Sequence, residues 1–435
     1  MHASRFDVVI LGGGLAGLAL ACALRETRLK IGLVEQQAPT RPSGWDARVY
    51  AVSPANATFL QEIGVWKHLP AERLASVQTM RITGDAGAHL VFSAYESGVS
   101  ELAWIAESSL MACELWENVK RQANLTLFSP AQAKAVEIGD AHAHLLLSDG
   151  GSVTTRLVVG ADGRDSWLRQ AVGLPAIDFH YGDMGVVANF SCELPHRSIA
   201  RQWFLGDSVL AWLPLAGDRI SLVWSLPDEH ARELLTLGAE EFCRRVAAAG
   251  GNELGRFTLL TPAAAFSLRL MQVPQTVAFR VALLGDAAHA IHPLSGHGIN
   301  LGFQDARALA HLLATTPEWQ DIGSQRRAAR LILQPHDLGA RRRSHIGRIL
   351  DLGGANLRGD AERGARQQQP AGDAEPCPEP ATRPARRPRL VPAGLTLRRP
   401  GRARATGPHR ELGAFGSRGG GGVRGSGRWT HRLGR

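Results

Sequence analysis

Apolar and polar positions divide about the first 320 residues into short strands, turns and helices. Residues 6–11 and 31–34 are apolar runs with the length of buried parallel strands, and residues 18–25 between them have a helical pattern. Two later apolar runs, 157–161 and 282–284, have the same character. Strands that alternate with helices in this way predict an α/β domain with a parallel, Rossmann-like sheet in three layers.

The pattern changes between about residues 180 and 280. Apolar and aromatic runs at 202–204, 209–215 and 220–225 predict antiparallel strands, and residues 233–249 predict one helix. Shorter runs at 80–82 and 89–92 predict strands of the same kind. We therefore expect a mostly antiparallel β-sheet domain, residues 76–99 and 181–274, inserted into an α/β domain made of residues 1–75, 100–180 and 275–325.

The first turn carries a nucleotide-binding pattern. Gly12, Gly14 and Gly17 form G-x-G-x-x-G between the first strand and its helix, and Glu35 ends the second strand. Glycines in this place let the backbone approach a pyrophosphate at the helix N-terminus, and the acid can accept bonds from a ribose. With both strands and the acid present, the pattern predicts a bound dinucleotide.

Two later loops repeat the combination of strand, glycine and acid. Asp162-Gly163 follows the strand at 157–161, and Gly285-Asp286 follows the strand at 282–284. A Gly-Asp pair alone is a common turn, but a place after a buried strand favours a ligand contact. A helix is predicted to begin near Asn300, where free N–H groups can face an electron-rich group.

Other candidate contacts lie near these loops. Pro293, Gly296 and Gly298 precede the helix at Asn300. Arg48 follows the second strand, where a loop can fold over a phosphate-bearing ligand.

Together the three motifs resemble the FAD-dependent aromatic hydroxylases of the p-hydroxybenzoate hydroxylase type. Segments 46–53, 210–215, 222–225 and 285–293 look like the ubiquinone-biosynthesis hydroxylase subfamily, and the resemblance covers about residues 1–320. It implies an FAD-binding domain, an inserted substrate domain, NAD(P)H as a transient co-substrate and O2 as oxidant. The implied substrate is an aromatic small molecule or a polyprenyl phenol.

The resemblance also implies roles for matching residues. The ADP half of FAD would contact Gly12, Gly14, Gly17 and Glu35, and Arg48 would also contact the cofactor. Asp162 and Gly163 lie in a motif linked to both FAD and NAD(P)H, and Asp286 would bind the ribityl chain or the pyrophosphate region. The residues facing the ring would be Pro293, Gly296, Gly298 and Asn300. No residue stands out as a catalytic base, since His289 and His292 are equally well explained as structural. His297 stands where the family usually has Gln, and it is either a neutral replacement or a titratable donor.

Composition narrows the class of protein. The 435 residues are 44% hydrophobic and 20% charged, which is typical of a globular protein with a sizeable core. The five cysteines are scattered, which favours thiols in a reducing compartment over disulfides or a metal site. Without an apolar run of membrane-spanning length or a signal-peptide pattern, the chain is expected in the cytoplasm, with possible peripheral contact to the inner membrane face.

The positive charge is confined to the end of the chain. Residues 361–435 contain 16 Arg and 5 acidic residues, a net +11 that exceeds the +9 of the whole chain. Residues 326–435 are rich in Arg, Pro and Gly, a composition typical of disorder and also of a GC-rich gene translated out of frame. Because aromatic residues are not interleaved with the arginines, we expect no nucleic-acid partner.

Two alternatives to the hydroxylase stay open. One is another FAD oxidoreductase of the same fold, and the other is an inactive FAD-binding protein with a basic interaction tail. A yellow protein whose NAD(P)H oxidation responds to a phenol would favour the hydroxylase.

Overall fold

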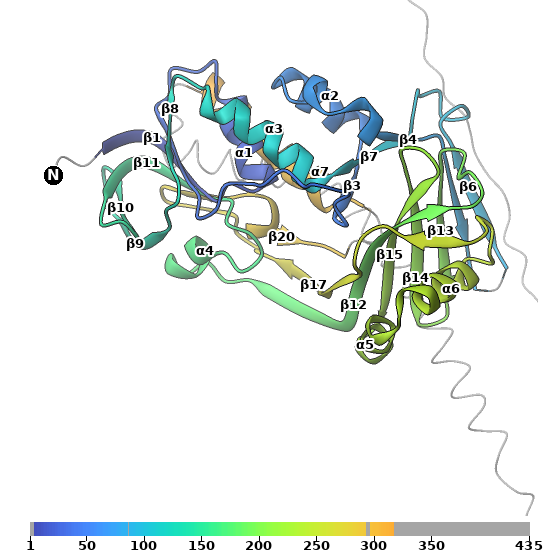
Figure 1. Ribbon diagram of the computed structural model, residues 1–435. Coiled ribbons are helices and arrows are strands. Elements are labelled where there is room, and N and C mark those ends of the chain that lie inside the picture. Colours follow the sequence, from blue (N-terminus) through green and yellow to red (C-terminus); the bar gives the residue numbers. More distant parts are fainter. Residues whose placement is uncertain (1–3, 86, 293–295, 317–435) are drawn as a thin grey trace, which may run out of the picture. The chain divides into compact units, whose positions relative to one another are not determined.

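The computed structural model describes residues 4–85, 87–292 and 296–316 (Figure 1). Its first sheet is built on β1 (Ser4–Leu11), which pairs in parallel with β2 (Ile31–Val34) and β11 (Ser152–Gly160). β8 (Leu125–Phe128) continues the parallel order beyond β2, and β19 (Val281–Leu283) continues it beyond β11. The antiparallel strands β9 (Ala133–Ile138), β10 (Ala143–Leu147) and β18 (Val277–Ala278) complete it. The predicted α/β fold is confirmed.

Both faces of this sheet are covered. On one face, α1 (Leu15–Ala23), α2 (Pro54–Glu62), α3 (Ser108–Lys120) and α7 (Gly298–Thr315) share a buried apolar core with β1. On the other face, α4 (Trp167–Ala171) and the antiparallel strands enclose a second core. Coverage on both sides explains why β1 and β11 are continuous apolar runs rather than alternating ones.

A second sheet has the order β20-β17-β12-β15-β14-β13-β5-β6, with β16 paired to β12. Its strands are β5 (Thr79–Thr83), β6 (His89–Ser93), β12 (Ile177–Cys192), β13 (Ile199–Leu205), β14 (Ser208–Leu215), β15 (Arg219–Pro227), β16 (Phe257–Leu259), β17 (Ala264–Gln272) and β20 (His289–Ala290). α5 (Asp228–Thr236) and α6 (Ala239–Ala249) share an apolar core with this sheet. The predicted antiparallel sheet is therefore present, with one parallel pair between β13 and β5.

A small third sheet lies between these parts of the fold. β7 (Ala103–Glu107) pairs with β3 (Val49–Val52) and with β4 (Ala75–Val77). Three 3-10 turns complete the described elements: η1 (Trp66–His68), η2 (Ala71–Arg73) and η3 (Gly285–Ala287).

Two sequence predictions need correction. The single helix predicted at 233–249 is two helices, because Leu237 and Gly238 are both extended, so that α5 ends before Leu237 and α6 begins after Gly238. The helix predicted from about Asn300 begins two residues earlier, at Gly298. Among the described helices, none is long and apolar enough to cross a bilayer. The predictions for the tail at 326–435 lie outside the described residues.

Candidate functional site

The glycine turn after β1 is crowded at two positions and open at a third. Gly12 has a φ of +105°, and a Cβ there would lie 2.4 Å from the Ala161 carbonyl oxygen. A Cβ at Gly17 would lie 2.1 Å from the Gly12 carbonyl oxygen. A Cβ at Gly14 would meet no atom within 4 Å. The first and third glycines are required for packing, whereas Gly14 leaves open space at the N-terminus of α1.

The N-terminus of α1 suits an anionic group. Gly14 is its N-cap, so no side chain caps it, and its first turn contains no acid. Glu35, at the end of β2, accepts hydrogen bonds from the backbone N–H groups of Gly13 and Gln37. A free helix N-terminus beside a carboxylate is the arrangement that holds a pyrophosphate and a ribose.

The loop after β11 contains a carboxylate oxygen without a partner. Asp162 Oδ2 accepts a hydrogen bond from Leu168 N–H at 3.0 Å, but Oδ1 is buried and has no hydrogen-bond partner among the described residues. Asp162 also borders the glycine turn, because a Cβ at Gly12 would lie 2.8 Å from Asp162 Cα. Gly163, the next residue, has a φ of +84°. Buried acceptors are normally paired, so this oxygen suits a ligand hydroxyl, as FAD would supply.

The loop after β19 is tied to α7 by a buried acid. Asp305 on α7 is fully buried, and its Oδ2 accepts a bond from Gly285 N–H at 2.9 Å and lies 2.6 Å from His289 Nε2. A Cβ at Gly285, where φ is +57°, would lie 3.1 Å from Ala16 Cβ on α1. Asp286, the next residue, is exposed. The third motif therefore lies against the first turn of α1.

Asn300 uses its whole side chain to hold α7 in place. Its Oδ1 accepts from Ser53 N–H at 2.9 Å and from Asn56 Nδ2 at 2.8 Å. Its Nδ2 donates to the carbonyl oxygens of Ala51 at 2.7 Å and Gly296 at 2.8 Å. These four bonds fill the capacity of an amide. Only the backbone of Asn300 therefore remains for a contact with a cofactor.

The structure describes some of the remaining residues predicted around α7, but not all of them. Gly298 is the first residue of α7, and a Cβ there would meet nothing within 4 Å. His297 is the N-cap and is exposed, and its side chain makes no capping hydrogen bond. Pro293 lies outside the described residues. The N-terminus of α7 is thus approachable at Gly298.

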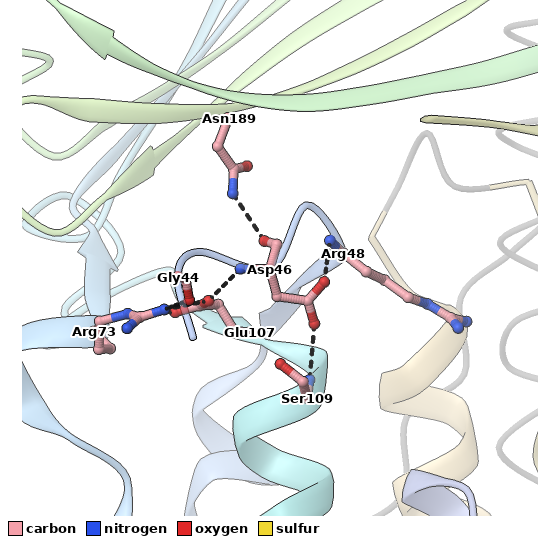
Figure 2. A network of polar contacts seen from close by, with 7 residues as sticks. All are labelled: Gly44, Asp46, Arg48, Arg73, Glu107, Ser109 and Asn189. Carbon is pink, nitrogen blue, oxygen red and sulfur yellow. Dashed lines mark hydrogen bonds and ion pairs between the residues drawn. The ribbon is translucent and has the colours of Figure 1, made fainter. Parts of the chain in front are cut away.

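Arg48 is exposed, and its side chain points away from the polar cluster beside it (Figure 2). Its backbone N–H donates to Asp46 Oδ1 at 2.8 Å, and its Cζ lies 5.5 Å from the centre of the Tyr50 ring. Burial raises the pKa of Tyr50, and the nearby Arg48 cation opposes that rise. The charge of Asp286 also raises the pKa of Tyr50, so Arg48 and Asp286 share one electrostatic environment.

The sequence did not predict the network that holds the loop before Arg48 (Figure 2). Glu107 is buried and forms two 2.7 Å bonds with Arg73, and it accepts Asp46 N–H at 2.6 Å. Asp46 Oδ2 accepts Ser109 N–H at 2.9 Å, and its carbonyl oxygen accepts Asn189 Nδ2 at 2.8 Å. The loop is therefore anchored to η2, to the start of α3 and to β12. The local signal was an acid directly before α3, but its partners Arg73 and Asp46 lie 34 and 61 residues away in the chain.

These loops meet because their strands are neighbours. β1, β11 and β19 are adjacent and parallel, so the turns at their carboxyl ends lie at the same edge of the sheet. This edge is where open α/β sheets bind their ligands. α7 closes the arrangement against α1, where a Cβ at Gly302 would lie 3.3 Å from Ala16 Cβ.

Comparison with known proteins identifies the fold and its cofactor. A family model described as "FAD binding domain" matches residues 5–319. The chain belongs to this family. It is an FAD-dependent aromatic monooxygenase, and the family uses NAD(P)H.

Two relatives and one solved structure are similar over most of the matched region. Ubiquinone hydroxylase UbiL of Rhodospirillum rubrum is 33% identical over 309 residues, covering 71% of this chain and 72% of that protein. The 3-demethoxyubiquinol 3-hydroxylase of Escherichia coli is 32% identical over 310 residues, covering 71% and 79%. Pseudomonas aeruginosa PqsL, in complex with 2-aminobenzoylacetate, is 23% identical with a TM-score of 0.65, covering 76% and 94%, and shares the fold.

Proposed function

We propose that this monooxygenase hydroxylates the aromatic ring of a polyprenyl phenol in ubiquinone biosynthesis. The observation that carries the proposal is the similarity, at 32–33% identity over 71% of the chain, to a ubiquinone hydroxylase and a 3-demethoxyubiquinol 3-hydroxylase. In the balanced reaction, a ring C–H, O2, NAD(P)H and a proton give a ring C–OH, NAD(P)+ and water.

The proposed FAD contacts are the residues that surround the edge of the first sheet. They are Gly12, Gly14, Gly17 and Glu35 for the ADP half, Arg48, Asp162, Gly163 and Asp286 for the rest of the chain, and Pro293, Gly296, Gly298 and Asn300 beside the ring. Bound FAD supplies the chemistry that joins the oxidation of NAD(P)H to the activation of O2.

The protein's own contribution is to position FAD and to stabilise negative charge on its ring. The N-terminus of α1 at Gly14 suits the pyrophosphate, and the unpaired Asp162 Oδ1 suits a hydroxyl. The N-terminus of α7 offers N–H groups and a positive dipole end to negative charge on the ring. Asn300 and Asp305 set the position of that helix through bonds to Ser53 and Gly285.

The substrate side supports an apolar acceptor. Large apolar side chains are exposed on β12, the strand that crosses beneath the first sheet in Figure 1. A long apolar tail would also bring the enzyme to a membrane surface, so we place it in peripheral contact with the inner membrane face.

Purified protein tests the proposal. We expect a yellow protein whose NAD(P)H oxidation is accelerated by a polyprenyl phenol, with one oxygen atom gained in the product by mass spectrometry. NAD(P)H oxidation without oxygen in the product would instead indicate another FAD oxidoreductase.

A matched pair of variants tests the cofactor site without turnover. Asp162→Asn is expected to weaken FAD binding about tenfold, because a carboxylate accepts a ligand hydroxyl more strongly than an amide does. Asp165→Asn is the control, because Asp165 is 80% exposed and pairs with Arg269. Titration of apo-protein with FAD measures both, and equal affinities would contradict the proposed role of Asp162.

A further inference from the structure

One side of β12 carries apolar side chains that no core among the described residues covers. Ile177, Phe179 and Tyr181 are 64%, 56% and 38% exposed. They alternate along the strand and so point to the same face. Leu270 on β17 lies directly opposite Phe179. We call these four residues the apolar strip.

The strip ends against the candidate site. The Phe179 and Tyr181 rings are 5.2 Å apart and nearly perpendicular, and Tyr181 meets the His292 ring in the same way at 5.0 Å. His292 follows β20 on the segment that connects the Gly285-Asp286 loop to α7. Exposure falls along the strip from Ile177 to Tyr181, so the strip leads from solvent toward the site.

The opposite face of the same ribbon carries charged side chains and the buried Met271. Asp178 and His180 alternate with the strip residues, and Arg269 lies opposite His180. Arg269 pairs with Asp178 at 3.1 Å and also with Asp165. The strip therefore carries no charge, and burial lowers the pKa of His292 to about 4, which keeps the end of the strip neutral near pH 7.

We propose that the apolar strip binds the polyprenyl tail of the substrate, with the aromatic head at the His292 end. This inference rests on the proposed function and deepens it. The strip is narrow, and its three β12 residues span only about 13 Å at ~3.3 Å per residue. A stable protein partner would need about 800 Å² on each side, whereas an extended aliphatic chain needs only such a row.

Paired variants and paired substrates test the inference. Phe179→Ser removes the centre of the strip, and Phe92→Ser on β6 is the matched control, because Phe92 is 46% exposed and lies outside the strip. Each enzyme is assayed with a farnesylated phenol and with the same phenol without a tail. For Phe179→Ser we expect KM for the tailed phenol to rise about tenfold, a loss of about 1.4 kcal/mol. kcat and the tailless KM stay unchanged, because the tail contributes equally to ground-state and transition-state binding.

The outcomes separate this inference from the proposed function. If KM for each phenol is the same in Phe179→Ser as in wild type, the tail site is overturned while the hydroxylase function stands. A raised KM for NAD(P)H alone would assign the strip to the co-substrate instead. If no phenol accelerates turnover, the proposed function fails. Calorimetric titration with the farnesylated phenol then decides on the strip, since loss of binding in Phe179→Ser supports it and unchanged binding overturns it.

Discussion

The edge of the first sheet and the apolar strip offer different kinds of atom to a ligand. At the sheet edge, the unsatisfied group is a buried carboxylate oxygen on Asp162, beside the free N-terminus of α1. On β12, the exposed groups are the carbon atoms of Ile177 and Phe179. Polar atoms without partners suit a ligand with phosphates and hydroxyls, whereas exposed apolar side chains suit an apolar one. This contrast is why we propose separate surfaces for the cofactor and for the tail of the substrate.

The network around Glu107 anchors the loop before Arg48, and its loss is expected to have the largest effect on stability. Glu107→Ala leaves the Arg73 guanidinium without its buried partner and should lower the free energy of unfolding by about 4 kcal/mol. Glu114→Ala is the control, because Glu114 pairs with an Arg41 that is 60% exposed, and it should cost less than about 1 kcal/mol. Denaturant unfolding measures both, and similar losses would show that the buried Glu107–Arg73 pair contributes no more than a surface ion pair.

Substitution in the glycine turn is expected to have the next largest effect on the free energy of unfolding. Gly17→Ala places a methyl group against the Gly12 carbonyl oxygen and should lower the free energy of unfolding by about 3 kcal/mol. Gly14→Ala meets no atom and should change it by less than about 0.5 kcal/mol while weakening FAD binding, since the methyl group enters the open approach. Unfolding curves and FAD titration separate the two. Unaltered FAD affinity in Gly14→Ala would mean that the pyrophosphate lies elsewhere.

The smallest expected effect concerns pH at the end of the apolar strip. Burial lowers the pKa of His292 from 6.5 to about 4, so between these values the unfolded chain binds the proton and the folded protein does not. Stability is therefore lost as pH falls from 6.5 to about 4, and solvent screening limits the contribution of His292 to about 1 kcal/mol. His292→Gln should lose less stability than wild type over this range. Identical pH profiles would show that His292 is not held neutral.

The local sequence was enough to predict the turns and strands at the edge of the first sheet. The order of strand, Gly12 to Gly17, helix, strand and Glu35 is contained in about thirty residues, so the local pattern reveals it. The boundaries at Gly238 and Gly298 were missed by pattern alone. The break between α5 and α6 interrupts a helical apolar period without changing it, and α7 begins at Gly298, two residues before the apolar pattern indicates.

The partners of the polar side chains could not be predicted in this way. The sequence did not signal that the Asn300 amide bonds to Ser53, 247 residues away. Asp46 accepts a bond from Asn189, 143 residues away, and nothing in either segment signals the other. The exposure of Phe179 was equally hidden, because an alternating apolar strand predicts a buried face as readily as an open one.

The sequence by itself determined the fold class, the nucleotide turn and the two later acid-and-glycine loops, because these depend on backbone conformation and on the period of apolar residues. Tertiary structure alone decided which carboxylates are satisfied and which apolar face is left uncovered. Those properties depend on atoms brought together from distant parts of the chain. Glu107 is neutralised by Arg73, whereas Asp162 keeps an oxygen free, and only folding distinguishes the two.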